Sequence, residues 1–316
     1  MFVPTELSHP AYSDEDEARQ FLETILWPQG AYCPFCGSPD SVKALGGKSM
    51  GPGWYHCGDC RKKFTVRVGT VFERSHIPLH KWLLGFRLYA GSKKGFSAHQ
   101  LHRTLNITYR SAWFMAHRIR EAMRDDRPGP LGGEGQVVES DETYIGPPAW
   151  VYSNERGWIQ ANTVDHKRKV LTLVERRGRA RSFVVDSLKA EDVRKVLMQN
   201  VDTASAIHTD EARHYPKATR DFAEHLTVNH SIQEYARGNV TTNTVEGFFS
   251  IFKRGMRGIY HHCGEQHLQR YLHEFDFRYS HRSAMGIEDA ERTTIAIKGA
   301  TGKRLTYRRT GPSTLG

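Results

Sequence analysis

The chain has 316 residues, of which 38% are hydrophobic and 11% aromatic, so it holds too much apolar material for a disordered polyelectrolyte. Its 45 Lys and Arg outnumber its 35 Asp and Glu, and the net charge of +10 indicates a polyanionic partner. No apolar run approaches the roughly 20 residues of a membrane span, and the acidic start is unlike a secretion signal. We therefore expect a cytoplasmic protein of two or three domains with no membrane partner.

Charge divides the first 127 residues into an acidic and a basic part. Residues 1–30 carry six acids and one base, whereas residues 61–127 carry fifteen bases and four acids. Residues 13–27 have a helical pattern with Ser13 as the N-cap, acids in the first turn, and an apolar face formed by Phe21, Leu22, Ile25 and Leu26. We expect residues 1–30 to form an acidic N-terminal helix.

Four of the five cysteines form two Cys-x-x-Cys pairs separated by twenty residues, namely Cys33, Cys36, Cys57 and Cys60. Zinc binds four thiolates tetrahedrally, and each pair supplies two of them from one tight turn. Four thiolates leave no position for a reactive water, so we expect structural zinc in a ribbon over residues 31–75. An alternating pattern predicts a strand at 64–68. A redox-active pair is the alternative interpretation.

The basic part has the pattern of a helix-turn-helix. Residues 97–105 and 109–123 are predicted helices joined by a turn at 106–108, and the second helix of such a motif enters the major groove of double-stranded DNA. We expect a DNA-binding domain over residues 76–127, with DNA contacts from Arg110, Arg118, Arg120 and Arg124. The alternative is a helical hairpin with a solvated basic face.

A Pro- and Gly-rich linker at residues 125–133 precedes a region in which strand and helix patterns alternate. The alternation predicts an α/β or α+β domain with a mixed sheet over residues 134–283. Strands are predicted at 136–144, 170–175, 181–185, 204–209 and 227–230, and helices at 191–199, 215–224 and 244–252. Residues 284–316 are expected to form a basic, weakly patterned tail.

Three acids of this domain are candidates for a shared site. Asp141 lies in the first strand on the same face as Glu139, and Glu142 lies on the opposite face. Asp210 ends a later strand, and strand ends are where α/β sheets place ligands. The helix near residue 246 has an aromatic side and an opposite polar stripe made of Asn243, Glu246, Ser250 and Lys253.

Converging carboxylates suit hard divalent cations, because Mg²⁺ prefers oxygen ligands and bridges carboxylates to phosphate. Two such ions stabilise the attacking and leaving oxygens in phosphodiester chemistry, and Lys253 could hold a phosphate near them. Periodicity alone favours a simpler interpretation, in which the helix is amphipathic with a solvated face and the acids cap turns.

At these residues the sequence resembles a known family, the zinc-ribbon DDE transposases of bacterial insertion sequences, known as the ISXO-like group. The resemblance spans nearly the whole chain. Besides the cysteine pairs, it rests on Glu139-x-Asp141-Glu142-Thr143-Tyr144-Ile145-Gly146, Thr209-Asp210-Glu211, Val228-Asn229-His230-Ser231, Asn243-Thr244-x-Glu246-Gly247-Phe248-Phe249, Lys253-Arg254-Gly255, Tyr260-His261-His262, His267-Leu268-Gln269-Arg270-Tyr271 and Glu274-Phe275-x-Phe277-Arg278-Tyr279.

The resemblance implies a ribonuclease-H-like mixed-sheet catalytic domain preceded by the zinc ribbon and the helix-turn-helix. It implies an acidic triad of Asp141, Asp210 and Glu246 and a downstream basic Lys253, and we take Asn243 as a further catalytic candidate. The implied activity is cleavage at transposon ends and joining of the freed 3′-hydroxyl to target DNA with Mg²⁺ or Mn²⁺. Because two ends must be held together, we expect a homodimer or larger synaptic complex at the nucleoid.

Two positions depart from the family pattern. Thr241 stands where the family has His, and Cys263 stands where it has a small or aliphatic residue. With His261, His262 and His267, Cys263 suggests a second metal site, although three adjacent ligands strain one tetrahedron; DNA contact or packing is the alternative. The alternative functions are a catalytically decayed DNA-binding regulator and a junction-resolving nuclease of the same fold.

Overall fold

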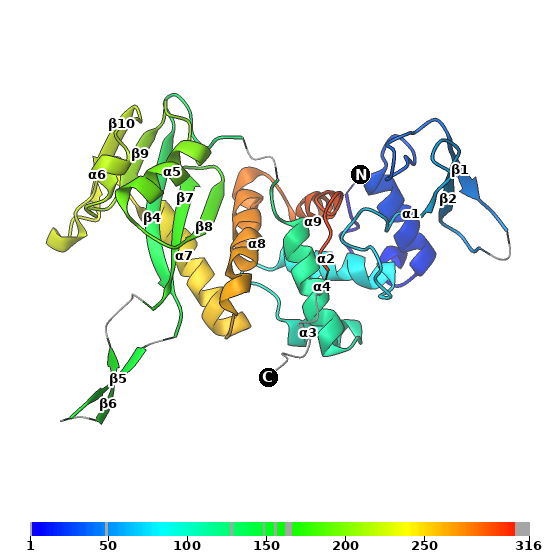
Figure 1. Cartoon of the computed structure of the whole chain (residues 1–316), viewed down its shortest axis with the longest axis horizontal. Coiled ribbons are helices and arrows are strands. Elements are labelled where there is room, and N and C mark those ends of the chain that lie inside the picture. The colour runs from blue at the N-terminus through cyan, green and yellow to red at the C-terminus, as the bar shows by residue number, and fades with distance from the viewer. Residues whose placement is uncertain are drawn as a thin grey trace, which may run out of the picture. The chain divides into compact units, whose positions relative to one another are not determined.

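The computed structural model describes residues 2–47, 50–126, 129–147, 149–154, 157–161 and 166–306. The chain forms two compact units (Figure 1). Unit 1 consists of Met1–Arg124 and Ile287–Gly316, and unit 2 consists of Asp125–Gly286. The division at residue 125 coincides with the start of the predicted linker.

The acidic N-terminal segment forms a helix that packs on the ribbon. Helix α1 (Glu15–Leu26) is capped by the side chain of Asp14 rather than by Ser13, which had been expected to cap it. Three acids occupy its first turn, where the helix dipole favours negative charge. The hydroxyl of Tyr55 in the ribbon donates a hydrogen bond to Glu23 at 3.1 Å. The helix and the ribbon are therefore one structural element of unit 1.

The ribbon is a three-stranded antiparallel sheet made of β1 (Val42–Leu45), β2 (Trp54–Cys57) and β3 (Lys63–Phe64). The predicted strand at 64–68 is wrong beyond Phe64, because the amide of Val68 turns back to the carbonyl of Thr65. Trp27 packs edge-on against Tyr55 and Phe64. These rings and the cysteines are the small apolar core of the ribbon.

The predicted helix-turn-helix is present in unit 1. The Ser97 and Gln100 side chains form a reciprocal capping box at the start of the first helix, and Asn106 ends it in the left-handed conformation. Thr108 caps the second helix. The helices of this part are α2 (Leu79–Gly91), α3 (Ala98–Leu105) and α4 (Tyr109–Ala122).

The C-terminal segment is a structured part of unit 1, so the expected weakly patterned tail is wrong here. Residues Asp289–Lys298 form α9, which packs against α2. The guanidinium of Arg292 donates to the carbonyl of Ala90 at 3.2 Å, and Ile297 is fully buried. A helix with one buried apolar face docks where a polar tail would remain solvated. Residues 307–316 of the expected tail lie outside the described residues.

Unit 2 is built on a five-stranded mixed sheet with the order β10-β9-β4-β7-β8. Strand β4 pairs antiparallel with β7, and β7 with β8, whereas β4 and β10 are both parallel to β9. This is the ribonuclease-H-like sheet that the resemblance implies. The strands are β4 (Val137–Ile145), β7 (Arg168–Glu175), β8 (Ala180–Val185), β9 (Ala206–Thr209) and β10 (Glu224–Thr227).

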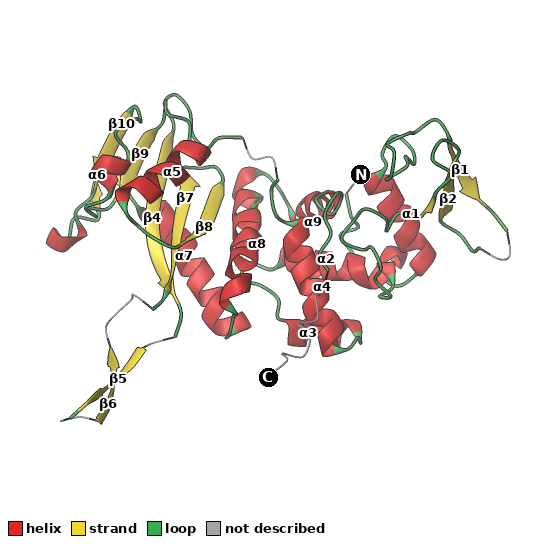
Figure 2. Ribbon diagram, viewed as in Figure 1, coloured by secondary structure: helices red, strands yellow, loops and turns green. Residues whose placement is uncertain are grey.

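Helices cover both faces of this sheet (Figure 2). Strand alternation divides β7 between two cores, since Leu171 and Leu173 face one helix pair and Val170 and Val174 face the other. The first pair is α5 (Ala190–Asn200) and α6 (Tyr215–Ala218), and the second is α7 (Asn243–Gly255) and α8 (Leu268–Ser280).

Some connections of unit 2 differ from the predicted ones. The helix predicted at 215–224 ends at Ala218, and the last strand of the sheet begins at Glu224. Two unpredicted hairpins are present: β5 (Ala149–Ser153) with β6 (Gly157–Ala161), and β11 (Ala236–Arg237) with β12 (Val240–Thr241). In the figures the β5–β6 hairpin extends away from the five-stranded sheet (Figure 2).

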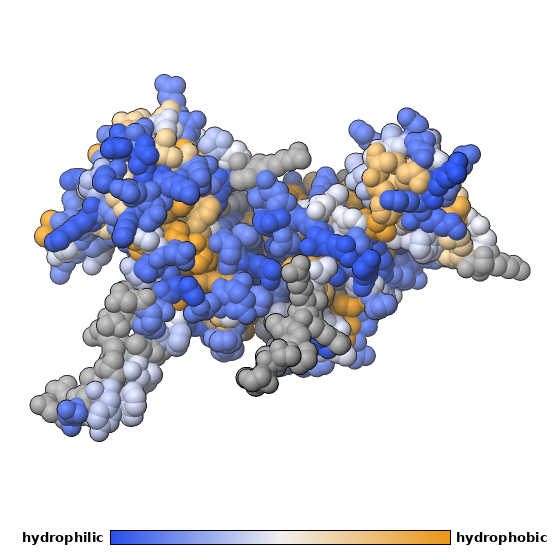
Figure 3. Space-filling model, viewed as in Figure 1, coloured by the Kyte–Doolittle hydropathy of each residue, from blue (hydrophilic) through white to orange (hydrophobic). Residues whose placement is uncertain are grey.

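Hydrophilic residues cover most of the face shown in Figure 3, as the charge content predicts. In the part of the chain that the structure describes, no helix is both long and apolar enough to cross a membrane.

A buried acid links α8 to the sheet. The Asp276 carboxyl group accepts hydrogen bonds from the Ser182 amide at 2.8 Å and hydroxyl at 2.6 Å. Burial raises the pKa of Asp276 to about 7. Because the folded state binds this proton more tightly than the unfolded state, the stabilisation is complete below pH 4 and is lost as the pH rises toward 7.

We expect the free energy of local unfolding to fall by up to about 1.4 kcal/mol per pH unit between pH 4 and 7. Hydrogen exchange of the β7 and β8 amides, corrected for the pH dependence of the intrinsic exchange rate, measures this free energy. Asp276→Asn should remove this pH dependence, whereas Asp186→Asn at an exposed position should retain it. If Asp276→Asn keeps the pH dependence of the parent protein, the raised pKa does not belong to Asp276.

Candidate active site

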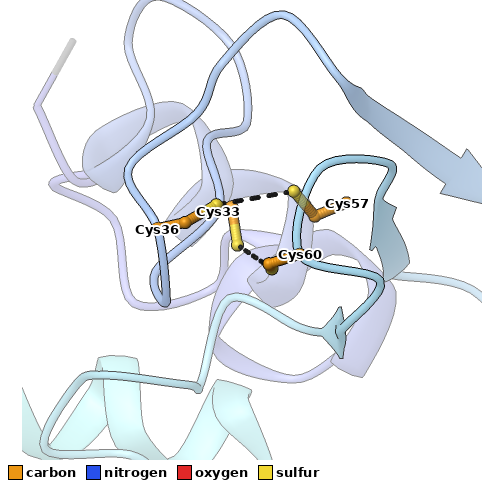
Figure 4. Close-up of side chains that lie close together, drawn as sticks. All are labelled: Cys33, Cys36, Cys57 and Cys60. Atoms are coloured by element: carbon orange, nitrogen blue, oxygen red, sulfur yellow. Dashed lines mark hydrogen bonds between the residues drawn. The ribbon is translucent and has the colours of Figure 1, made fainter.

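The four predicted zinc ligands converge on one point in unit 1 (Figure 4). The sulfur atoms of Cys33 and Cys60 are 3.5 Å apart, those of Cys36 and Cys57 are 3.6 Å apart, and all four lie within 4.8 Å of one another. A tetrahedron with Zn–S bonds of about 2.3 Å has S–S edges of about 3.8 Å. The cluster therefore fits structural zinc.

Strand β4 presents three acids on the faces that alternation predicts. Glu139 is fully buried against α7, whereas Glu142 on the opposite face accepts a hydrogen bond at 2.8 Å from the hydroxyl of Tyr215 in α6. Asp141 has the parity of Glu139 and so belongs to the α7 face. The buried strand thus carries a carboxylate toward each helix layer.

Glu139 holds the first turn of α7 against β4. Its carboxylate accepts hydrogen bonds from the amides of Thr244 at 2.8 Å and Val245 at 3.0 Å, and from the Thr244 hydroxyl at 2.8 Å. The guanidinium of Arg176, on the turn after β7, also pairs with the Glu139 carboxylate at 2.8 Å. These amides are the ones that a helix leaves without internal partners, so the carboxylate satisfies them and fixes the helix start.

Asp210 follows the end of β9, the strand that runs parallel to β4. The paired register of the two strands ends at Glu139 and His208, and Asp210 lies two residues beyond His208. Burial raises the pKa of Asp210, and the nearby charge of Glu142 raises it further, while the Ala212 amide, which donates to its carboxylate at 3.0 Å, lowers it.

Glu246 lies on the polar stripe of α7. The buried side of that helix contains Val245, Phe248, Phe249 and Phe252, as predicted, and Glu246 is exposed. Its carboxylate accepts a hydrogen bond from the Thr242 hydroxyl at 2.7 Å and lies 3.5 Å from the His230 ring. Asn243 is exposed on the first residue of the helix.

The other two predicted carboxylates both act electrostatically on Asp141. Burial raises the pKa of Asp141 to about 7, and the charges of Glu142, Asp210 and Glu246 add to this rise. The charge of Asp141 in turn acts on Lys253, whose pKa is lowered mainly by burial. Carboxylates that repel one another suit a divalent cation, because a cation relieves the repulsion.

The carboxylates are neighbours without being tightly clustered. Among the described residues, the ribbon cysteines are the only group of three or more His, Cys, Asp or Glu ligands within 4.8 Å. The segment with His261 and His262 therefore forms no such group. Cys263 packs beside the α7–α8 core, which favours the packing role over a second metal site.

Two of the four predicted DNA contacts are wrong. Arg118 is buried and donates to the carbonyls of Val71 and Glu73 at 2.8 and 2.9 Å. Arg120 is 2% exposed and lies over the Tyr89 ring. Their guanidinium groups hold unit 1 together and are not available to a phosphate, whereas Arg110 and Arg124 are exposed.

Sequence reasoning missed several side chains around the carboxylates. The sequence pattern indicates no role for Arg176 or His230, and for Glu142 it indicates only the face of the strand. His230 and Glu142 both lie within segments that resemble the family. That resemblance is the sequence feature that could have marked these two residues as functional. Arg176 lies in a turn between two strands, and nothing in its local sequence distinguishes it from a solvated base.

Comparison with known families agrees with this architecture. Residues 130–280, within unit 2, match the ISXO2-like transposase domain. Residues 13–63, which contain α1 and most of the ribbon, match the transposase zinc-ribbon domain. A ribonuclease-H-like sheet with these two domains defines a zinc-ribbon transposase. The chain belongs to the ISXO-like family of zinc-ribbon DDE transposases.

A related protein comes from Halobacterium salinarum, where it is described as an uncharacterized protein in transposable element ISH50. It is 28% identical over 282 residues, which cover 84% of this chain and 91% of that protein. Among solved structures, a chain of the simian T-cell lymphotropic virus intasome in complex with PP2A regulatory subunit B56 gamma matches 56% of this chain and 67% of its own. At 15% identity and a TM-score of 0.28, this likeness supports no conclusion about the present chain.

We expect one zinc ion per chain, and we expect its removal to unfold the ribbon, because so small a core does not hold by itself. Metal analysis and hydrogen exchange of β1 and β2 measure this. Cys57→Ser should lose zinc and the protection of these strands, whereas Cys263→Ser should retain both. A chelated protein with a protected ribbon would contradict the assignment.

Glu139→Gln should destabilise α7 in unit 2, because it removes the counter-charge of the half-buried Arg176 and turns an amide toward backbone donors. Breaking a buried pair costs on the order of 3 kcal/mol, which corresponds to roughly 10²-fold faster exchange of the Thr244 and Val245 amides. Glu224→Gln, at an exposed position on β10, is the control. Unchanged exchange in Glu139→Gln would show that the carboxylate does not hold the helix.

Proposed function

We propose that the protein is a DNA transposase that cleaves the ends of an insertion sequence and joins the freed 3′-hydroxyl to target DNA. Asp141, Asp210 and Glu246 hold the catalytic cations in this proposal. The observation that carries it is that, in an ISXO2-like transposase domain, a carboxylate just after β9 and one on α7 both act electrostatically on Asp141 of β4.

The oxygen donors of the triad suit Mg²⁺ or Mn²⁺. When bound, a pair of such ions stabilises the attacking and leaving oxygens of a phosphodiester exchange. Glu139 keeps α7, and with it Glu246, against the strand that carries Asp141. Lys253 binds a phosphate of the strand that is cut, and Asn243, exposed at the helix start, hydrogen-bonds the same strand.

Unit 1 is proposed to recognise the ends of the element. Helix α4 enters the major groove, and Arg110 near its start and Arg124 just beyond its end contact DNA phosphates. Two chains or more assemble so that both ends are held at once. A protein that acts in this way works at the nucleoid, in the cytoplasm.

Asp141→Asn, Asp210→Asn and Glu246→Gln should each reduce Mg²⁺-dependent cleavage by at least about 10³-fold, because each removes a charged oxygen donor. DNA that carries the inverted repeats flanking the gene is the substrate, and gels resolve cleavage and strand transfer. Binding of this DNA should persist, and Asp186→Asn should remain active.

Strand transfer retained by any triad variant would remove that residue from the triad. If the parent protein binds these ends and never cuts them, the protein is a DNA-binding regulator instead. If it cuts branched DNA without joining strands, it is a junction-resolving nuclease.

Affinity for the ends should fall steeply with salt, because bound Lys and Arg release counterions from DNA. Arg110→Gln should weaken binding and lower the slope of log K against log salt by about 1. Arg220→Gln, which removes an exposed base of unit 2, should leave the slope unchanged. Fluorescence anisotropy between 50 and 200 mM salt measures both, and equal slopes for Arg110→Gln and the parent would exclude the contact.

A further inference from the structure

A cavity of about 470 Å³ opens in unit 2 beyond the candidate triad. Its walls come from the end of β4, the start of β7, the end of α7 and the segment that leads to α8. This volume lies within the range of pockets that take a small organic ligand. No carboxylate of the triad lines it, whereas Lys253 does, so the cavity adjoins the candidate active site and extends it.

The lining combines cations, rings and apolar surface. Lys253, Arg168 and Arg257 supply positive charge, and Glu265, the one acid among the described lining residues, is paired with Arg168. Ring surface comes from His166, His261 and His262, and apolar surface from Ile145, Met256 and Leu268. A site for phosphate alone needs only the cations. Rings and apolar groups beside cations suit an anion that carries a flat, partly apolar group.

The cavity adjoins the carboxylates. Tyr144 lies three residues after Asp141 on β4, a separation of about 10 Å at 3.3 Å per residue. Lys253 lines the cavity and also lies within the electrostatic reach of Asp141. A nucleic-acid strand whose phosphate contacts Lys253 therefore has its neighbouring nucleotide at the cavity.

The backbone around the cavity is held in an uncommon conformation. Residues Met256–Tyr260 form a π-helical turn, and His261 follows with φ of 56° and ψ of −49°. Such strain persists only where the surrounding structure imposes it, and both features are frequent at functional sites. Tyr260 is anchored from behind, since its hydroxyl donates to Glu274 at 2.5 Å and its ring packs edge-on against Tyr271.

The anchored turn brings His261 and His262, both exposed, to the cavity wall.

We propose that this cavity takes one unstacked nucleotide of the DNA strand that the carboxylates cut. Its phosphate lies against Lys253 and Arg257, and its base lies against the histidine rings. Enzymes that extrude a nucleotide offset a few kcal/mol of unstacking in such a pocket. This inference rests on the proposed function, because it requires DNA at the triad.

The test uses binding alone, on protein that carries Asp141→Asn, so that cleavage plays no part. Duplexes with the flanking inverted repeats are made fully paired or with a single mismatch at successive positions around the end. A mismatch removes part of the unpairing cost, so one position should bind about tenfold more tightly than the paired duplex. Fluorescence anisotropy measures each affinity.

Arg257→Ala with His262→Ala should abolish this preference for the mismatched duplex. Arg254→Ala, which removes an exposed base of α7 outside the cavity, should retain it. Circular dichroism melting confirms that each variant is folded. If no mismatch position is preferred, or if the double variant keeps the preference, the cavity does not take a nucleotide and the inference is overturned.

The two proposals fail in different ways. A mismatch preference that depends on the cavity, in a parent protein that never cuts, would support the nucleotide site and refute the transposase activity. Cleavage and strand transfer without any such preference would support the transposase activity and refute the nucleotide site. A protein that binds none of these duplexes would refute both.

Discussion

The geometry of unit 2 depends on one buried carboxylate. Glu139 has no exposed surface, and taking a charge out of water costs several kcal/mol unless it is fully hydrogen-bonded. Here the cost is offset by two backbone amides of α7, a hydroxyl and Arg176. Because the amides belong to the first turn of α7, the same bonds set where the helix begins. The position of Glu246 relative to β4 follows from that start.

Sheet topology determines the rest of the constellation. Asp141 lies in β4, and Asp210 directly follows β9, which pairs parallel to β4 as far as Glu139 and His208. Burial between two helix layers then raises the pKa of Asp141. A sheet strand, a strand end and a helix start thus place three acids that are far apart in sequence in one electrostatic neighbourhood.

Sequence patterns predicted the features that are encoded locally. Cysteine spacing, strand alternation at Glu139 and Glu142, and the polar stripe of α7 depend on residues close in sequence, and the structure has all three. Errors within one segment concern the caps and ends of elements, whereas the errors of role concern partners distant in sequence. Arg118 points at carbonyls more than forty residues away, so its local pattern matches that of a solvated base. The docking of α9 on α2 joins segments about two hundred residues apart.

In unit 2, a group of acids lies next to a group of cations. The acids of β4, β9 and α7 raise the pKa of Asp141, and a few residues further along β4 the cavity is lined by cations. Lys253 lies between the acids and the cavity. The charge of Asp141 raises the pKa of Lys253, while burial and the charge of Arg257 lower it. A polyanion in contact with both regions therefore meets attraction at the cavity and repulsion at the acids. Bound cations reverse that repulsion, so a DNA strand and divalent ions should bind cooperatively, each relieving the charge that opposes the other.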